Sequence, residues 1–297
     1  MTEGQNLRGI MLMVASMALF AMEDMFIKLA AKGIPTGEII LVAGLFGVPV
    51  FAWLARRSGK SVWVRAAWRP AVALRNLGEM VGSIAYVTAL ASVPLPTVSA
   101  VLQAMPLVVT MGAALFLREQ VGWRRWSAIA VGFVGMLLVI RPGLNGFQPQ
   151  ALWVLITVAG LAVRDLASRA VPAEYSAAQV SAWGAMAITL LGVMMMGWTG
   201  KAVVPDAAQA LYLILMAIFG TAGYWAITAA TRTGEVAVVA PFRYARLVFA
   251  IVIGWAVFRE PADALTLCGA GLIIGSGLYS FARARNRKKL SMAAAAS

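Results

Sequence analysis

The chain has 297 residues, of which 61% are hydrophobic and only 12% are charged, and its mean hydropathy is +0.82. Soluble globular domains carry about twice this share of charge, so the composition excludes an ordinary soluble protein and indicates a chain embedded in the hydrocarbon core of a bilayer. The net charge is +13, but the basic residues stand in short gaps between apolar runs, which argues against a nucleic-acid-binding surface.

Ten segments are long and apolar enough to span a membrane as α-helices, with breaks at proline, glycine or charged residues. In chain order they cover residues 8–32, 36–55, 70–92, 95–117, 124–141, 149–170, 177–198, 207–232, 235–258 and 262–282. The first segment is too long for a signal peptide and carries two acidic residues, so we interpret it as a retained helix. The loops are short, which excludes a separate soluble domain.

The distribution of lysine and arginine predicts the orientation, because cytoplasmic loops carry an excess of these residues. If the N-terminus is cytoplasmic, sixteen Lys and Arg residues fall on the cytoplasmic side and four on the other side. We therefore predict a multi-pass protein of a bacterial cytoplasmic (inner) membrane, with both termini in the cytoplasm and an even number of spans.

The two halves of the sequence resemble each other at a constant offset of 141 residues. Arg118-Glu119 ends the fourth segment and Arg259-Glu260 ends the ninth, and the same offset pairs Asp24 with Asp165. Internal similarity at a fixed spacing is typical of duplicated architectures.

Five helices is an odd number, so the second copy must enter the membrane upside down. The predicted fold is therefore all-α, with ten transmembrane helices in two inverted five-helix repeats, residues 1–143 and 149–282, followed by a basic cytoplasmic tail, residues 283–297. Many secondary transporters share this design and bind their substrate near the midplane, between the repeats.

The fourth and ninth segments are each followed by a glycine-rich helix. The first contains Gly132-x-x-Gly135 and runs into Val139-Ile140-Arg141-Pro142-Gly143, and the second contains Gly271-x-x-x-Gly275. With the ten spans and the Arg-Glu ends, nearly the whole chain resembles the EamA-type branch of the drug/metabolite transporter superfamily. The resemblance implies export of amino acids and related metabolites, or of cationic drugs, and the pattern is similar to the YddG-type exporters of aromatic amino acids.

Nine ionisable residues are predicted at membrane depth, where an unpaired charge is costly and usually functional. They are Glu23, Asp24, Lys28, Arg75, Glu79, Arg164, Asp165, Arg243 and Arg246. Opposite charges four residues apart can neutralise each other along a helix face, and three such pairs occur: Asp24–Lys28, Arg75–Glu79 and Asp165–Arg169.

Three of the carboxylates, Glu23, Asp24 and Asp165, are candidates for gating or for proton coupling. The chain has no histidine, so a coupled proton would need a carboxylate whose pKa is raised by burial. In the inverted arrangement, Asp24 and Asp165 fall towards opposite faces of the membrane.

The predicted substrate site is built around Glu79, Arg243 and Arg246, which lie near the centres of the third and ninth segments. A guanidinium holds a carboxylate in a bidentate geometry, and a buried carboxylate can accept an ammonium group. Together they would suit a zwitterionic amino acid. A structural bridge from Arg246 to Glu79 or to Glu23 is the alternative.

Polar and aromatic residues at helical spacing complete the predicted cavity. The residues predicted to line it are Ser83, Tyr86, Gln103, Trp183, Tyr224 and Tyr244. Gln103 belongs to a polar stripe with Ser99 and Thr110, and Tyr244 is its partner at the 141-residue offset. The tryptophan could stack on an aromatic or apolar substrate, with ordinary packing as the alternative.

The sequence also argues against an enzyme. With one cysteine, Cys268, and no histidine, it excludes an intrachain disulfide, a Cys–His zinc site and a Ser–His–Asp triad. Gly200-Lys201-Ala202 lacks the spacing of a phosphate loop.

We therefore expect a secondary transporter that exports small metabolites, above all aromatic or apolar amino acids, by alternating access at a central cavity, with no metal and no cofactor. Its expected partners are the small-molecule substrate and the lipid bilayer, and the oligomeric state is not predicted. Two alternatives stay open, an exporter of organic cations, drugs or other metabolites and a membrane scaffold that transports nothing.

Overall fold

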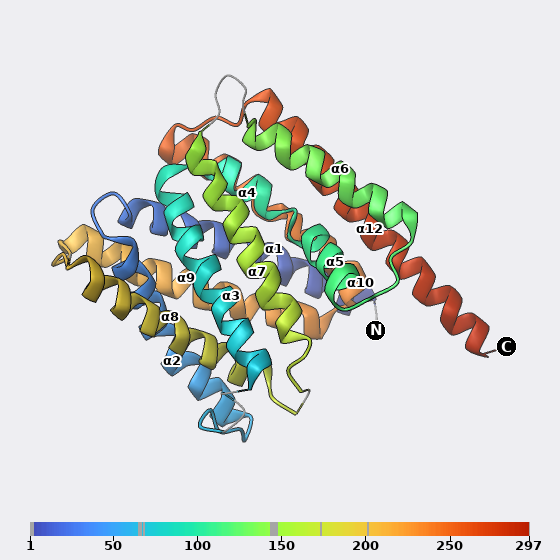
Figure 1. Cartoon of the computed structure of the whole chain (residues 1–297), viewed down its shortest axis with the longest axis horizontal. Helices are drawn as coiled ribbons and strands as arrows, with labels where there is room; N and C mark the ends of the chain where they lie inside the picture. The colour runs from blue at the N-terminus through green and yellow to red at the C-terminus, as the bar shows by residue number, and fades with distance from the viewer. Residues whose placement is uncertain are drawn as a thin grey trace. The chain divides into compact units, whose positions relative to one another are not determined.

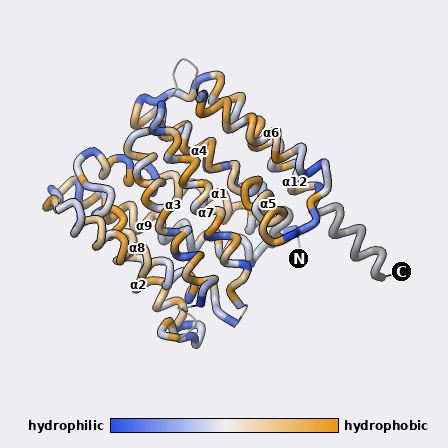
Figure 2. The backbone as a smooth tube through the Cα atoms, in the orientation of Figure 1, coloured by the Kyte–Doolittle hydropathy of each residue, from blue (hydrophilic) through white to orange (hydrophobic). Residues whose placement is uncertain are grey.

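The computed structural model describes residues 3–64, 67, 69–142, 148–172, 174–200 and 202–296. The regular structure of these residues is entirely helical, with no strand among them. Figure 1 shows the course of the chain, and Figure 2 shows that hydrophobic residues follow the helices while hydrophilic residues gather at their ends. This is the distribution that a bilayer requires, because a helix satisfies its own backbone hydrogen bonds.

Each predicted segment falls on one helix or on a succession of short helices. In chain order the elements are α1 (Glu3–Ala30), α2 (Thr36–Arg57), α3 (Pro70–Ser92), α4 (Leu95–Leu102), α5 (Met105–Phe116), α6 (Trp123–Ile140), η2 (Pro149–Ala151), α7 (Leu152–Ser168), α8 (Ala177–Thr199), α9 (Ala207–Thr233), α10 (Val236–Val239), η3 (Ala240–Tyr244), α11 (Ala245–Ile253), η4 (Gly254–Phe258) and α12 (Ala264–Ala296). The largest differences lie at the chain ends, where α1 starts earlier than predicted and α12 continues beyond residue 282.

Nine helices among the described residues are long and apolar enough to cross a membrane. The third predicted span, α3, has 23 residues but is not one of the nine. It carries Arg75, Asn76 and Glu79 in its first half, and these side chains lower its hydropathy. Its membrane-spanning role therefore stays a prediction.

Two of the predicted spans are interrupted at proline. Gln103 and Ala104 separate α4 from α5, whose first turn contains Pro106. In the ninth span a 3₁₀ turn, η3, contains Pro241 and separates α10 from α11. Proline has no backbone N–H and its ring crowds the preceding turn, so both interruptions lie where proline disfavours a regular α-helix.

The chain divides into two compact units. Unit 1 comprises Met1–Ala18, Pro96–Pro149 and Gly223–Ser297, and unit 2 comprises Leu19–Leu95 and Gln150–Ala222. Each unit draws on both halves of the sequence, so the compact units do not coincide with the predicted five-helix repeats.

Unit 2 is built on two close helix pairs, α2 with α8 and α3 with α7. Glycines lie at both contacts. A methyl group at Gly78 of α3 would be 2.7 Å from the carbonyl oxygen of Gly160 in α7, and one at Gly192 of α8 would be 2.7 Å from the Cα of Leu41 in α2. Small residues let helix backbones approach closely in a membrane.

Unit 1 contains the pair α6 and α12, which lie side by side in Figure 1. They are closest at Gly135 and Gly269, where a methyl group on either residue would be 2.6 Å from the carbonyl oxygen of the other. Beyond the end of α6, the guanidinium of Arg141 donates to the carboxylate of Asp263 and, over 3.3 Å, to the hydroxyl of Thr266.

The Arg141–Asp263 ion pair predicts a pH-dependent stability. The hydrogen bond from Arg141 lowers the pKa of Asp263 from 3.8 to about 2. A carboxyl group whose folded pKa lies below its unfolded value stabilises the fold above the unfolded pKa, and this contribution is lost as the pH falls through the folded pKa. Because about half of the Asp263 side chain is exposed, we expect a contribution of only about 0.2–1 kcal/mol.

Asp263→Asn should therefore lower the thermal unfolding midpoint slightly at neutral pH. The difference in midpoint between the variant and the wild type should disappear between about pH 4 and pH 2. Thermal unfolding in detergent micelles over that range measures it. A gap that stays constant down to the lowest pH would assign the effect to the hydrogen bonds with Thr266 instead of to the charge.

Candidate functional site

The two interrupted spans meet within unit 1. The side-chain amide of Gln103, between α4 and α5, donates a hydrogen bond over 3.1 Å to the carbonyl oxygen of Tyr244, at the end of η3. A backbone carbonyl freed by an interrupted helix is costly in a membrane unless another group satisfies it. Gln103 is buried and supplies that group. The structure thus brings together two predicted site residues that the 141-residue offset relates.

Ser99 is a buried residue that the sequence placed in a polar stripe but not among the candidates. It lies one turn before Gln103 on the same face of α4, and it is 1% exposed. Its hydroxyl oxygen has no hydrogen-bond partner among the described residues. A buried hydroxyl without a partner costs about 1–3 kcal/mol, so such a group needs an explanation, and a bound polar ligand is one.

Tyr244 and the two arginines of the ninth span occupy different surroundings. The Tyr244 hydroxyl lies against Gly277 of α12, where a methyl group would collide with it. Arg243 is exposed in η3, whereas Arg246 is partly buried in the first turn of α11. The two arginines therefore lie on different elements, with the end of the 3₁₀ turn between them.

Tyr224 also belongs to unit 1, in the second half of α9, and is partly buried. Its carbonyl oxygen accepts a hydrogen bond from the hydroxyl of Thr228 over 2.8 Å. The hydroxyl of Thr231 likewise bonds to carbonyl groups of its own helix. The two threonines that follow Tyr224 thus satisfy their donors locally.

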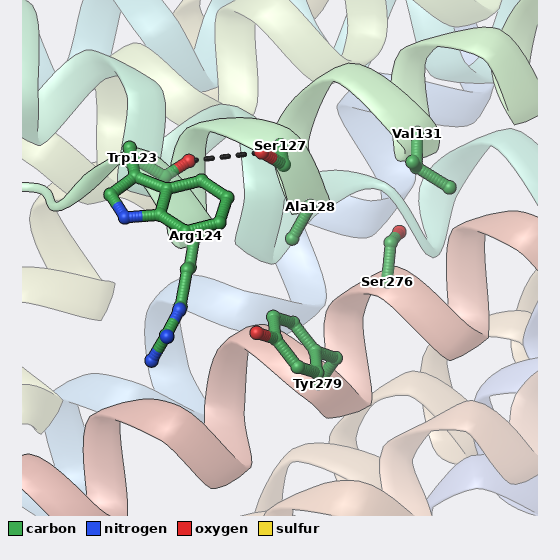
Figure 3. A pocket seen from close by; sticks show the side chains of 7 residues that line it. All are labelled: Trp123, Arg124, Ser127, Ala128, Val131, Ser276 and Tyr279. Atoms are coloured by element: carbon green, nitrogen blue, oxygen red, sulfur yellow. Dashed lines mark hydrogen bonds between the residues drawn. The ribbon is translucent and has the colours of Figure 1, made fainter.

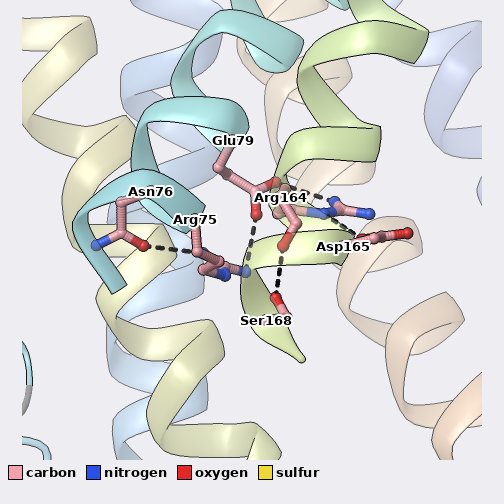
Figure 4. A network of polar contacts seen from close by, with 6 residues as sticks. All are labelled: Arg75, Asn76, Glu79, Arg164, Asp165 and Ser168. Carbon is pink, nitrogen blue, oxygen red and sulfur yellow. Dashed lines mark hydrogen bonds and ion pairs between the residues drawn. The ribbon is translucent and has the colours of Figure 1, made fainter. Parts of the chain in front are cut away.

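Unit 2 holds a network of four charged residues on α3 and α7 (Figure 4). Glu79 Oε2 lies 2.8 Å from Arg75 Nη2, and Glu79 Oε1 lies 3.2 Å from Arg164 Nη1. Arg164 Nε is in turn 2.8 Å from Asp165 Oδ1. The predicted Arg75–Glu79 pair is confirmed, and Arg164 is a second partner that spacing along one helix could not reveal.

Glycines on the neighbouring helices make this network possible. Gly78 and Gly160 bring α3 and α7 close enough for Glu79 to reach Arg164. Gly184 of α8 lies against the guanidinium of Arg75, and a methyl group there would collide with it. Because both oxygens of Glu79 contact guanidinium groups, its carboxylate is the centre of an ion network rather than an open acceptor for an ammonium group.

The second half of α1 is fixed to α3 by two polar contacts. Asp24 is buried and accepts a hydrogen bond from the hydroxyl of Tyr86. One turn later, Lys28 donates over 2.6 Å to the carbonyl oxygen of Val93, at the end of α3. The carboxylate of Glu23 lies against Gly220 of α9. Two predicted site residues, Asp24 and Tyr86, are thus direct partners.

The remaining predicted residues of unit 2 differ in their accessibility. Ser83 lies on α3 between Glu79 and Tyr86 and is partly buried, whereas the Asp165 side chain is 41% exposed. Trp183 is 3% exposed, and its indole N–H donates over 2.8 Å to the carbonyl oxygen of Val62. Its ring also packs against Tyr175, so packing occupies both its ring and its polar atom, and we leave it out of the site proposed below.

The chain has no histidine and one cysteine, Cys268, so a metal site would need acidic residues as ligands. In the part of the chain that the structure describes, no three His, Cys, Asp or Glu side chains gather closely enough to hold a metal ion.

Comparison with known proteins gives one family. The model of the EamA-like transporter family matches residues 7–141 and again residues 148–281. These two matches cover most of the chain and start 141 residues apart, the offset at which the two halves of the sequence resemble each other.

Similar proteins of known function are membrane transporters. An S-adenosylmethionine uptake transporter of Rickettsia prowazekii is 24% identical over 92% of both chains, and a riboflavin transporter of Rhizobium johnstonii is 29% identical over 75% of both. The pseudopaline exporter CntI of Pseudomonas aeruginosa is 24% identical over 90% of this chain and 93% of the exporter. A solved crystal structure with 19% identity shares the fold, with a TM-score of 0.61 over 96% of this chain and 99% of the other.

Proposed function

This chain belongs to the EamA-like transporter family, and from that membership we propose that it is a ten-helix secondary transporter of two inverted repeats that exports a zwitterionic, amino-acid-like metabolite. The chain is a membrane transporter of this family. The proposal adds the repeat architecture, the class of substrate and the direction.

A pair of related contacts supports the inverted repeats. In unit 2, Arg164 contacts Glu79, and Glu23 contacts Gly220. Adding 141 to a residue number leads from Glu23 to Arg164 and from Glu79 to Gly220. The two contacts therefore join equivalent positions of the two halves. The Gln103–Tyr244 hydrogen bond of unit 1 joins positions that are each other's equivalents. Both relations are expected if a pseudo-twofold axis relates the halves.

The paired helix interruptions are the single observation that carries the proposed substrate site. Interrupted transmembrane helices commonly form the ion and substrate sites of secondary transporters, and here the two interruptions share a hydrogen bond. The buried hydroxyl of Ser99 lies beside them without a partner. Arg246, in the next turn, offers a guanidinium that suits a carboxylate. A substrate with a carboxylate and further polar groups fits this set.

One relative's substrate supports this class, S-adenosylmethionine, whereas riboflavin carries neither a carboxylate nor an ammonium group and fits the alternative of another metabolite. S-adenosylmethionine carries an α-amino acid group together with an aromatic base, and so combines the zwitterionic and aromatic features that the sequence predicts. The exporter among the relatives supports outward transport, and the uptake transporters make inward transport the alternative that the assay must test. Glu23, Asp24 and Asp165, all in unit 2, are the proposed gating or proton-coupling carboxylates.

Arg246→Ala tests the substrate site. A charge-assisted hydrogen bond contributes about 1.5–3 kcal/mol, so we expect transport of the preferred substrate to fall about tenfold to a hundredfold, with partial recovery in Arg246→Lys. The measurement is uptake and efflux by proteoliposomes of labelled aromatic amino acids, S-adenosylmethionine, riboflavin and an organic cation.

Arg232→Ala is the matched control, because Arg232 is an exposed arginine of the same unit at the end of α9. It should transport at the wild-type rate. Wild-type rates in Arg246→Ala would remove this residue from the site, and transport of only the organic cation would overturn the zwitterionic substrate class.

A further inference from the structure

A cavity of about 300 Å³ lies between α6 and α12 in unit 1 (Figure 3). The helix α6 contributes Arg124, Ser127, Ala128 and Val131, and α12 contributes Tyr279 and Ser276. The two helices are in close contact at Gly135 and Gly269, so the cavity occupies the part of the pair that lies towards the start of α6.

The end of this cavity at Trp123 and Tyr279, here called its mouth, lies where the apolar spans of both helices end. The apolar span of α6 starts at Trp123, and that of α12 ends at Arg283. Trp123 and Tyr279 line the cavity and are exposed, as expected of aromatic residues at the boundary between water and lipid. The cavity therefore opens at the level of the lipid headgroups.

The charge at the mouth is positive. The guanidinium of Arg124 lies over the ring of Trp123, with its central carbon 5.2 Å from the ring centre. Arg283 is exposed one turn beyond Tyr279 on the same face of α12. The lining residues among those the structure describes include Arg124 and no carboxylate, so an anion at the mouth would meet a guanidinium group.

The part of the cavity further along the apolar spans, here called its floor, is apolar, with Ala128 buried and Val131 43% exposed. Ala128 and Val131 lie one to two turns further into the membrane span than Arg124. The hydroxyl groups of Ser127 and Ser276 are bonded to carbonyl oxygens of their own helices, Trp123 over 3.1 Å and Ile273 over 2.9 Å. The cavity thus changes from a cationic, aromatic mouth to an apolar floor, which is the polarity sequence of a phospholipid.

We propose that this cavity binds one anionic phospholipid. Its phosphate contacts Arg124 and the hydroxyl of Tyr279, and the upper part of one acyl chain lies along Ala128 and Val131. A volume of about 300 Å³ is at the small end of ligand sites, so the cavity holds the headgroup region and leaves the rest of the lipid in the bilayer. Basic pockets between transmembrane helices are known to hold acidic headgroups, and the apolar floor distinguishes a lipid from free phosphate.

The test is a titration of the full-length protein in detergent with phosphatidylglycerol or phosphatidylcholine, with the bound lipid counted by native mass spectrometry. We expect one tightly bound phosphatidylglycerol and weaker binding of phosphatidylcholine. Arg124→Gln should weaken phosphatidylglycerol about fivefold, the effect of one basic residue near an anionic surface. Val131→Trp should also weaken it, because the larger side chain fills the floor without changing the charge.

Arg57→Gln is the matched control. The guanidinium carbon of Arg57, at the end of α2, lies 5.3 Å from the centre of the Trp53 ring. Neither residue lines the cavity. This variant should bind phosphatidylglycerol as the wild type does. Equal binding of the two lipids, an equal loss in Arg57→Gln and Arg124→Gln, or unchanged binding in Val131→Trp would each overturn the proposal. Displacement of the lipid by millimolar inorganic phosphate would instead identify a site for free anions and overturn it as well.

Discussion

Replacing Glu79 by glutamine is expected to lower the free energy of unfolding by about 3 kcal/mol, at the lower end of the effect of removing one partner from a buried ion pair. The carboxylate contacts Arg75 on its own helix and Arg164 on α7. Without its charge, two guanidinium groups would stay in a largely buried position with one carboxylate, Asp165, still nearby. Equilibrium unfolding in mixed micelles measures the loss.

Asp165→Asn is the control within the same network. Asp165 contacts Arg164 over 2.8 Å but its side chain is 41% exposed, so we expect a loss of at most about 1 kcal/mol. A double-mutant cycle of Glu79→Gln with Arg164→Gln should give a coupling energy of about 0.5–3 kcal/mol. Equal losses in Glu79→Gln and Asp165→Asn would contradict the central position of Glu79.

The same variants separate a structural role of Glu79 from a role in transport. If Glu79 only holds α3 to α7, transport per folded molecule should change little in Glu79→Gln. Loss of transport with wild-type stability would return Glu79 to the substrate site that the sequence predicted. Both outcomes leave the insertion of the chain into the membrane intact, because the neighbouring spans are unchanged.

Gly78→Ala is the second substitution with a large expected effect. Its methyl group would lie 2.7 Å from the backbone nitrogen of Arg164 and from the carbonyl oxygen of Gly160. Both are backbone atoms, so relief requires α3 and α7 to move apart. Overpacking of this kind costs about 1–3 kcal/mol, and the movement would also lengthen the Arg164–Glu79 contact. The thermal unfolding midpoint in detergent measures the loss.

Gly275→Ala provides the matched comparison for this substitution. Gly275 lies inside α12, and a methyl group there would have no atom within 4 Å among the described residues, apart from the backbone and chain neighbours of its own helix. Alanine is the better helix former by about 1 kcal/mol, so Gly275→Ala should leave the midpoint unchanged or raise it. If Gly78→Ala were as stable as Gly275→Ala, the close approach of α3 and α7 would not contribute to stability.

The positions of the helices follow from the sequence alone, because a bilayer leaves the chain few choices. A spanning segment must satisfy its own backbone, so an apolar run of about 20 residues becomes a helix. The missing N–H of proline favours the breaks at Pro106 and Pro241, but proline alone does not dictate them, since α2 continues through Pro49. The Arg75–Glu79 pair was predictable, since residues four apart share one face of a helix.

The partners that lie on other helices could not be read from the sequence. The sequence favoured Glu79 as a group that binds substrate, and only the tertiary structure showed that Arg164, 85 positions later, shares its carboxylate. For Trp183 the sequence left stacking on a substrate and ordinary packing open, and only the tertiary structure showed that its N–H donates to the carbonyl group of Val62. The compact units, each drawn from both halves, were equally hidden.

The sequence thus determined the class of the protein, the places of its helices and the duplication that relates its halves, because hydropathy and periodicity are properties of neighbouring residues. The tertiary structure decided which charges are paired, which hydroxyl lacks a partner and where a cavity opens between α6 and α12. Those features depend on how closely two helices approach, which is set by glycines such as Gly78 and Gly135 together with the residues that face them.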